Sequence, residues 1–413
     1  MIAADSPRTG TDAGQGRLMA MIAALYFTQG LPMGLSMEAL PVMMRQAGVP
    51  LEIIAFVPLA SLPWIVKLLW APLVDNNWIP RLGRRRTWIL SMQAILALSF
   101  LALGLFPLEG TGLWLAITAL AIGALASATQ DTATDGLAAE TLAGKKLSAA
   151  NAFQIGGMMA GFIVGGGGVL MFVDLLGQAG VMTLLALFPL ASILLALFWK
   201  EERIERPARN HPDRARLATT FRRPGIITLL LLAAIYGGAH AGGMSVSRLL
   251  LVDLGWSNSA TGLVATIGGI AMIVAGCPLG AALTNRKRWQ AVVIGMISAA
   301  ATFLCWSLLA AGVVPASWPM VLLATGLLSI VSGIIAVSAA TIIMAFGGSG
   351  KQAGTDVTVL QSANVTGEML FASLAVWIAG VGGFGMTFVG AAIVVFCAAL
   401  VVRYLGGRLA SPA

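Results

Sequence analysis

The sequence predicts an all-α membrane protein of twelve transmembrane helices in two six-helix bundles. Three observations carry this prediction. The 413-residue chain is 58% hydrophobic and only 10% charged, whereas soluble globular domains carry about 25% charged residues. Its apolar segments each have the roughly 20 residues needed to cross about 30 Å of hydrocarbon. Its basic residues are concentrated in alternate connections between these segments.

The connections between the apolar segments are too short to hold a separate enzymatic or nucleotide-binding domain. We therefore expect an N-terminal bundle over 1–199, a flexible, charged, proline-containing cytoplasmic linker over 200–224, and a C-terminal bundle over 225–413. The twelve expected spans are 18–44, 51–74, 87–106, 113–139, 147–173, 179–199, 225–252, 257–283, 289–312, 317–346, 354–379 and 383–404.

The distribution of positive charge predicts the orientation. Of the 25 Lys and Arg residues, 22 lie in the tails and loops on the side of both termini. Cytoplasmic loops carry such an excess, so we expect both termini in the cytoplasm and the protein in the cell inner membrane. The net charge of +8 follows from this topology and indicates contact with membrane lipid rather than nucleic acid. A monomer is expected.

The two halves carry a weak parallel repeat. The string RRRTW at Arg84 corresponds to RKRW at Arg286, and GKK at Gly144 corresponds to GKQ at Gly350, at nearly equal offsets close to half the chain. Parallel repeats of six spans are typical of one large class of secondary transporters.

Glycines recur along the fifth expected span. Gly157, Gly161 and Gly165 are spaced four residues apart, which places them on one helix face. Small residues at this spacing let membrane helices approach closely. Plain helix packing is one interpretation, and hinge bending is the other.

Ionisable residues within the spans are unevenly distributed. Spans three, six, nine and twelve have none in their interiors, as expected of helices that surround the others. Such residues are costly in hydrocarbon and mark substrate or proton pathways. They are Glu38, Lys67, Asp131, Asp135, His240, Arg248, Asp356 and Glu368.

Depth along the helices selects candidate binding residues. At 1.5 Å per residue, Gln29, His240 and Glu368 each lie about 20 Å from a cytoplasmic end, near the midplane where transporters of this class bind substrate. Glu368 is a candidate for proton coupling, and His240 is alternatively a structural histidine. The expected substrate-binding residues are Gln29, Lys67, Tyr236, His240, Gln361 and Asn364.

Asp131 and Asp135 are one helical turn apart and share a helix face. Two close carboxyl groups cannot easily both ionise in a poorly solvated place, which suits proton coupling. For Asp131, three roles are open: proton carrier, partner of Lys67 and part of a cytoplasmic gate. For Asp135, the favoured role is a gate contact with the basic run Arg84–Arg86.

The sequence indicates neither a cofactor nor a metal site. Cys277, Cys305 and Cys397 lie in separate apolar spans without paired spacing, which is not the pattern of a disulfide framework or a zinc site. No Walker-type phosphate-binding loop is present, and no nucleophile–base pair stands out. We therefore do not expect an enzyme.

Several strings in the first half resemble one branch of the major facilitators. They are LYFTQGLPMGL at Leu25, KLLWAPLVD at Lys67, LGRRRTW at Leu82 and SATQDTATDGLAAE at Ser127. This branch contains the muropeptide permeases, the acetyl-coenzyme A transporters and the rhizobactin and pyochelin siderophore importers. The resemblance implies the major facilitator fold. It also implies a cytoplasmic gate of Asp75, Arg84, Arg85, Arg86 and Asp135.

The compact twelve-span chain is most similar to the siderophore importers in this branch. The resemblance thus implies a proton-coupled importer of a ferric siderophore, with the iron–siderophore complex and protons as its small-molecule partners. One alternative is a permease of the same fold for muropeptides or another small solute. The other is a membrane sensor that binds an iron chelate without moving it.

Overall fold

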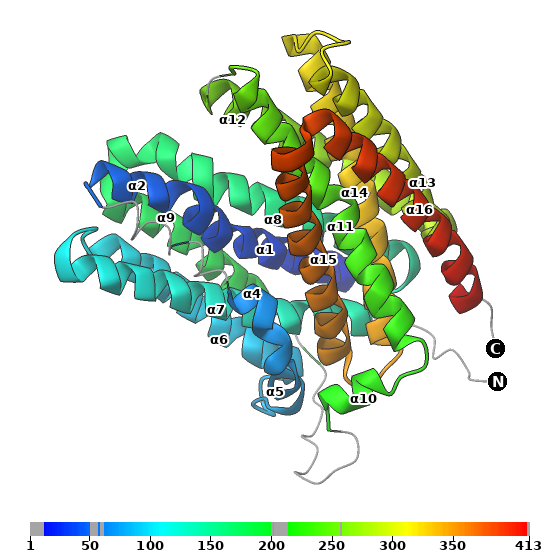
Figure 1. Ribbon diagram of the computed structural model, residues 1–413. Coiled ribbons are helices and arrows are strands. Elements are labelled where there is room, and N and C mark those ends of the chain that lie inside the picture. The colour runs from blue at the N-terminus through cyan, green and yellow to red at the C-terminus, as the bar shows by residue number, and fades with distance from the viewer. Residues whose placement is uncertain are drawn as a thin grey trace. The chain divides into compact units, whose positions relative to one another are not determined.

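The computed structural model describes residues 12–49, 57, 62–199, 201, 214–256 and 258–410. Regular structure in this part of the chain is helical throughout (Figure 1). The helices of the first half are α1 (Asp12–Gly34), α2 (Leu40–Gln46), α4 (Pro63–Val66), α5 (Ala71–Asn76), α6 (Arg84–Leu105), α7 (Gly110–Thr141), α8 (Gly144–Ile163) and α9 (Val169–Phe198). Those that follow are α10 (Leu217–Phe221), α11 (Ile226–Asp253), α12 (Asn258–Ala271), α13 (Cys277–Ala310), α14 (Trp318–Gly348), α15 (Ala353–Gly382) and α16 (Phe384–Ala410).

Seven helical stretches of the described chain are long and apolar enough to cross a membrane. Two of them, Gly144–Phe198 and Ala260–Ala310, have 55 and 51 residues, more than twice the length of one span. Each is broken near its middle, at Gly177 (φ 67°) and Lys287 (φ −152°), between two expected spans. The predicted class, an all-α multi-pass membrane protein, is confirmed. The count of twelve stays a prediction, because span 51–74 lies partly outside the described residues.

The helices group by their contacts into two compact units. The first consists of residues 1–143, 157–220 and 344–359, and the second of residues 144–156, 221–343 and 360–413. The domain limits 1–199 and 225–413 stay a prediction.

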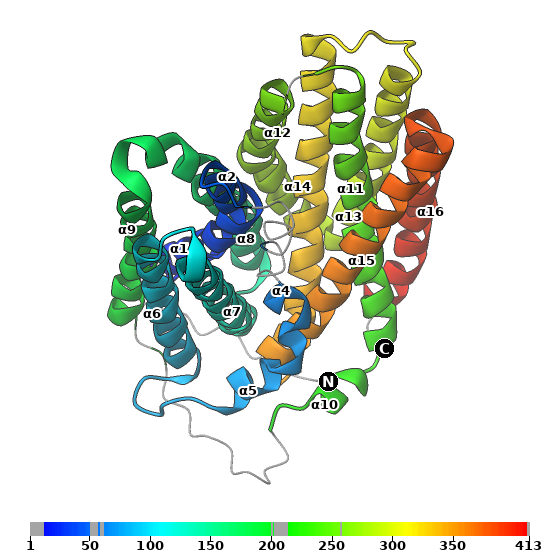
Figure 2. The same ribbon diagram turned by 60° about the vertical axis from the view of Figure 1, so that its left-hand side comes forward.

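The first unit has an apolar interior between α6, α7 and α9, which lie side by side in Figure 2. Leu96 and Phe100 of α6, Leu120 of α7 and Met182 of α9 are all buried there. The opposite face of α6 exposes leucines such as Leu105. Apolar side chains on both faces are what a helix between protein and lipid requires, because lipid tails are as apolar as the core.

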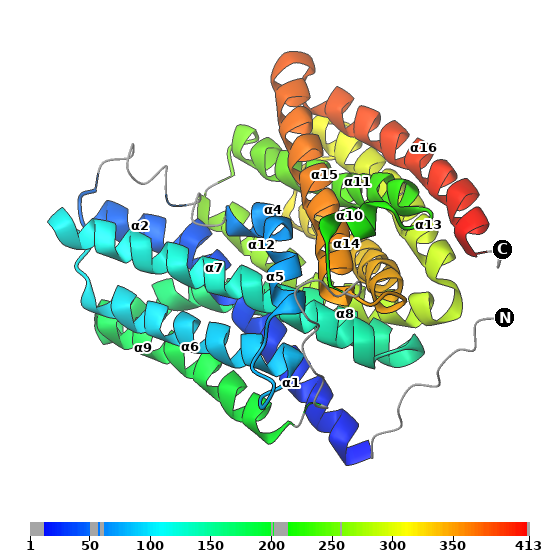
Figure 3. The same cartoon turned by 90° about the horizontal axis from the view of Figure 1, so that it is seen from below.

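The second unit is centred on α13, which packs along α16 (Figure 3). The buried rings of Trp306 on α13 and Phe388 on α16 stack with centroids 5.9 Å apart. Helix α11 contacts the same pair of helices. Figure 2 shows α14 and α15 running beside α11 in this unit.

Glycines bring α1 and α8 into backbone contact within the first unit. A Cβ added to Gly161 would overlap the carbonyl oxygen of Phe27, and one added to Gly30 would overlap that of Met158. Gly34 and Gly165 show the same close approach one turn further along. The contact favours the packing interpretation of the glycine run over the hinge.

The second unit repeats this device between α11 and α15. A Cβ on Gly237 would overlap the carbonyl oxygen of Asn364, and one on Gly367 would overlap that of Ala234. In each half of the chain, the first expected span thus packs against the fifth, and glycines at the contact allow the two backbones to approach closely. This agrees with the parallel repeat in the sequence.

Replacing Gly161 with Ala is expected to destabilise the protein by about 1–3 kcal/mol, because overpacking forces the two backbones apart. The matched control is Gly167→Ala in the same glycine run, where an added Cβ meets nothing within 4 Å. Thermal unfolding of the purified variants in detergent measures the difference. Equal melting temperatures for the two variants would contradict the close packing of α1 on α8.

Candidate functional site: buried charges of the first unit

Lys67 and Asp131 form an ion pair in the interior of the first unit. The Lys67 Nζ donates to Asp131 Oδ2, and both side chains are only 3% exposed. The ammonium group also lies 5.1 Å from the ring centroid of Trp64. Of the three roles open for Asp131, partner of Lys67 is the one seen in this structure.

Helices α4 and α7 position this pair. Lys67 begins a short 3-10 segment, Lys67–Leu69, directly after α4, and Asp131 lies ten residues before the end of α7. The indole N–H of Trp70 donates to Thr129 at 3.1 Å, which anchors the segment to α7. At 1.5 Å per residue, the pair lies about 15 Å inside that end of the helix.

Asp135 is bound by α1. The Tyr26 hydroxyl donates to Asp135 Oδ1 at 2.8 Å, and both residues are fully buried. Gln29, one turn further along α1, is 1% exposed. Its Nε2 has no hydrogen-bond partner among the described residues, so this amide keeps a donor for a ligand or water. The gate role predicted for Asp135 stays a prediction.

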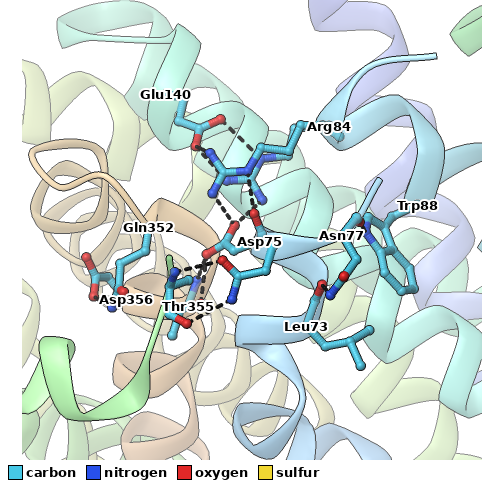
Figure 4. A network of polar contacts seen from close by, with 12 residues as sticks. Leu73, Asp75, Asn77, Arg84, Trp88, Glu140, Gln352, Thr355 and Asp356 are labelled. Carbon is cyan, nitrogen blue, oxygen red and sulfur yellow. Dashed lines mark hydrogen bonds and ion pairs between the residues drawn. The ribbon is translucent and has the colours of Figure 1, made fainter. Parts of the chain in front are cut away.

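A second charged cluster joins α5, α6 and α7 (Figure 4). Arg85 is completely buried and donates to Asp75 at 2.6 Å and to Glu140 at 2.6 and 3.1 Å. Arg84 lies 3.0 Å from Asp75 and 3.1 Å from Glu140. Three of the predicted gate residues, Asp75, Arg84 and Arg85, are therefore in one network.

Glycine makes room for the buried guanidinium group. A Cβ on Gly136 of α7 would lie 2.5 and 2.6 Å from the two terminal nitrogens of Arg85. The guanidinium group of Arg85 thus lies against the α7 backbone at Gly136, the residue that follows Asp135. The fourth predicted gate residue, Arg86, turns elsewhere and donates to the Leu197 carbonyl oxygen at 2.7 Å.

The first turn of α15 contributes the remaining donors to Asp75. The backbone N–H and the hydroxyl of Thr355 each donate to Asp75 Oδ2 at 2.7 Å. A carboxylate is stabilised at a helix N-terminus, where backbone N–H groups are free. Burial alone would raise the pKa of Asp75, but Arg85, Arg84 and Thr355 together lower it below its usual value. The side chain is therefore ionised at neutral pH.

Glu201, at the start of the predicted linker, caps the N-terminus of α6. Its carboxylate accepts the backbone N–H of Arg85 at 2.9 Å and that of Arg86 at 2.8 Å. The residue before the helix is Gly83 with φ 104°, a conformation that favours glycine. Burial raises the pKa of Glu201 above its usual value, although the two N–H groups oppose this shift.

Replacing Glu201 with Gln should lower stability by about 1 kcal/mol, because a neutral amide is a weaker acceptor for two helix N–H groups. Glu109→Gln is the control, since Glu109 precedes α7 without a side-chain capping bond. The melting temperature should fall for Glu201→Gln alone. Equal values for the two variants would show that the cap contributes nothing.

Two amides hold the end of the linker before α10. Asn76 of α5 accepts from the backbone N–H of Ala215 and donates to its carbonyl, both at 2.8 Å. Gln352 accepts from the N–H of Arg216 at 2.8 Å and donates to Thr220 at 2.6 Å. The Thr220 hydroxyl in turn donates to Asp356 at 2.6 Å. The linker end, α5 and α15 are thus bonded together inside the first unit.

The predicted site residues of the second unit lie along the contact between α11 and α15. Asn364 Nδ2 donates to the Ala233 carbonyl at 3.0 Å, and Glu368 packs against Gly237. Gln361 is half-buried. The side chains of Tyr236 and His240 lie outside the described residues.

Around Asp75 and the linker end, the sequence analysis missed Asn76, Glu140, Glu201, Gln352 and Thr355. Glu140 is the last residue of the string that begins at Ser127. It follows Asp135 by about one and a half helical turns, which was enough to suggest it as a further partner for the basic run. The other four bond to partners that are 116 or more residues away along the chain. Nothing in their local sequence points to those partners.

The match to a known protein family lies in the first half of the chain. A family model described as acetyl-coenzyme A transporter 1 matches residues 18–175. An anhydromuropeptide permease of Escherichia coli K12 is 28% identical over 263 residues, which cover 60% of this chain and 53% of that protein. A putative transporter AmpG 4 of Rickettsia conorii is 22% identical over 68% of this chain and 71% of that protein. The chain thus spans about half the length of the E. coli permease.

Solved structures show the fold. The human organic anion transporter MFSD10 superimposes with a TM-score of 0.72 at 15% identity, over 94% of this chain and 99% of that one. The proton:xylose symporter XylE gives 0.70 at 12% identity, over 96% of each chain. The E. coli fucose:proton symporter FucP, solved in an outward conformation as a major facilitator superfamily transporter, gives a TM-score of 0.67 at 14% identity, over 94% of this chain and 98% of that one. The chain therefore has the major facilitator fold, as the sequence predicted.

The named relatives bear on the choice between the predicted solutes. Their names refer to muropeptides and acetyl-coenzyme A. They therefore lend the siderophore prediction no support and favour the muropeptide alternative.

Proposed function

We propose that this protein is a secondary transporter of the inner membrane that moves muropeptides by proton-coupled alternating access. The observation that carries the transport proposal is the buried ion pair of Lys67 and Asp131 inside a helix bundle of the major facilitator fold. Ion pairs in the hydrocarbon region are expensive and typically belong to substrate or proton pathways. The muropeptide proposal is supported by the similarity to the E. coli permease.

The pair offers a simple coupling step. Protonation of Asp131 neutralises the carboxylate and removes its attraction for the Lys67 ammonium group. The ammonium is then available for an anionic group of the solute, and muropeptides carry carboxylates. Loss of the proton restores the ion pair and displaces the solute, so the two binding events are linked through Lys67.

The charged cluster of Asp75, Arg84, Arg85 and Glu140 supplies a gate in this proposal. Asp75 accepts two hydrogen bonds from Thr355 and holds the first turn of α15 against α5 and α6. When α15 moves away from Asp75, the charges of Asp75 and Arg85 become exposed to water. Their hydration then offsets part of the energy lost with the two hydrogen bonds from Thr355. Arg84 and Glu140 belong to the same gate, and Arg86 and Asp135 stay as its predicted neighbours.

The solute is tested by ligand-dependent stabilisation of the purified protein, because a ligand that binds only the folded state raises its stability. We expect anhydromuropeptides to raise the melting temperature and ferric pyochelin or rhizobactin to leave it unchanged. Uptake of radiolabelled anhydromuropeptide into cells expressing the protein should follow the same order. Stabilisation and uptake with the ferric chelate alone would replace muropeptide with siderophore as the substrate.

The proton step is tested by Asp131→Asn, with Glu368→Gln as the variant for the other candidate. Asp131→Asn should reduce uptake driven by a pH gradient by at least about tenfold. Binding of the solute should be retained, because the neutral Asn side chain mimics the protonated state of Asp131. Initial rates in vesicles with and without an imposed pH gradient measure this. If only Glu368→Gln uncouples uptake, the proton site belongs to the second unit.

A further inference from the structure

A small, partly open cavity lies among the helices of the second unit, where Arg248 is exposed. It has a volume of about 30 Å³ and is bordered by helices α11, α12, α13 and α14. Its polar lining residues are Ser247, Arg248, Thr261, Trp306, Thr325 and Ser329.

These residues gather at one end of the four helices. Arg248 lies five residues before the end of α11, and Trp306 lies four residues before the end of α13. Thr261 and Thr325 follow the starts of α12 and α14 by three and seven residues. At 1.5 Å per residue, all four are within about 10 Å of this end.

Three polar atoms around the cavity are buried without a hydrogen-bond partner among the described residues. They are Nε1 of Trp306 and the hydroxyl oxygens of Thr261 and Thr325. Trp306 is only 1% exposed, and its stacking on Phe388 fixes the plane of its ring. A buried donor left without a partner destabilises the folded state. An occupant that accepts hydrogen bonds removes this cost.

The lining favours a negatively charged occupant. Arg248 carries the formal charge among the lining residues that the structure describes, and none of those residues is Asp or Glu. The guanidinium group and the indole N–H are donors only, and the hydroxyls can also donate. A water molecule finds acceptors for its two protons only at the hydroxyl oxygens, whereas an anion accepts from every one of these donors.

The geometry points to a binding site for a small inorganic anion of halide size in this cavity. One water-sized probe occupies about 10–15 Å³ by the same measure, so about 30 Å³ holds a halide ion but not a sugar or a peptide. Its lining shares no residue with the proposed muropeptide and proton sites. Its occupant joins four helices of the second unit and stabilises their packing.

Chloride titration of the purified full chain tests this site. Melting temperatures are compared in sodium chloride and sodium gluconate at constant ionic strength. We expect a rise that increases with the logarithm of the chloride concentration, a similar rise with bromide, and none with gluconate. Equal melting temperatures in all three salts would overturn the proposal and indicate a water-filled cavity.

Matched variants locate the effect. Trp306→Phe removes the indole donor, and Arg248→Gln removes the charge. Each should raise the chloride concentration needed to stabilise the protein by about tenfold or more, because a hydrogen bond to a charged group contributes about 1.5–3 kcal/mol. Trp318→Phe, at the exposed start of α14, should respond as the wild type does.

A conservative pair keeps the test informative if Trp306→Phe fails to fold. Thr325→Val removes one unpartnered hydroxyl, and Thr266→Val removes an exposed hydroxyl bonded to the Gly262 carbonyl. Thr325→Val should weaken the chloride response and Thr266→Val should not. An unchanged response in both Thr325→Val and Arg248→Gln would place the chloride effect elsewhere and overturn the proposal.

Discussion

Asp75→Asn should destabilise the protein by about 3–5 kcal/mol, the usual effect of removing one partner from a buried ion pair. The substitution removes the carboxylate that faces Arg85 at 2.6 Å and Arg84 at 3.0 Å. It also weakens both hydrogen bonds from Thr355. Glu140 stays as a partner of Arg85, which places the effect towards the lower end of this range.

The control for Asp75→Asn is Asp174→Asn, because Asp174 is an exposed carboxylate on α9. Unfolding of both variants in detergent, followed by helical circular dichroism, gives the comparison. The double variant Asp75→Asn with Arg85→Met should regain part of the lost stability, since it leaves no buried cation behind at position 85. If Asp75→Asn were as stable as Asp174→Asn, the cluster would contribute no net stabilisation.

Lys67→Met should have the second largest effect, again about 3–5 kcal/mol, because it leaves the Asp131 carboxylate buried without its ion-pair partner. Asp131→Leu alone should be comparably unstable. Replacing both residues with apolar side chains should restore most of the wild-type stability, since such pairs are often neutral or favourable to replace. The melting temperatures of the two single variants and the double variant measure this coupling.

The same double variant separates stability from function. Lys67→Met with Asp131→Leu should fold well and yet fail to accumulate solute against a gradient, because it has lost the proposed proton step. Accumulation at the wild-type level by this variant would make the ion pair purely structural. The control is Lys145→Gln, which removes an exposed positive charge at the start of α8 and should leave accumulation unchanged.

Much of the fold could be predicted because a membrane restricts the chain so strongly. Apolar length and basic loops predict the helices, whereas the spacing of Gly157, Gly161 and Gly165 left helix packing and hinge bending open. The structure shows Gly161 and Gly165 against the α1 backbone. The breaks at Gly177 and Lys287 also fall where short polar or glycine-containing stretches separate apolar ones.

The charged site could be predicted only in part. The sequence indicates a gate at Asp75, Arg84 and Arg85, because these opposite charges lie close together in the short stretch after an apolar segment. The Lys67–Asp131 pair was one of three open roles for Asp131, since sequence gives depth along a helix but not the partner across it. Tyr26, the donor to Asp135, gave no such signal, because an aromatic residue on an apolar helix usually belongs to the core.

The contacts of Glu201, Asn76 and Gln352 could not be predicted from the sequence. Each bonds to backbone groups of a segment far along the chain, and a backbone N–H carries no residue-specific signal. The charge of the linker predicted a flexible connection, whereas its described end at Ala215 and Arg216 is bonded at both residues. Such bonds depend on the path of the chain and not on composition.

Solute counterflow in proteoliposomes tests whether this protein is a carrier or a sensor. Vesicles containing the purified protein are loaded with unlabelled anhydromuropeptide and diluted into a trace of labelled solute. For a carrier we expect a transient accumulation of label that is faster with an inward pH gradient and absent from Lys67→Met/Asp131→Leu vesicles. Binding of the solute without any accumulation of label would contradict it.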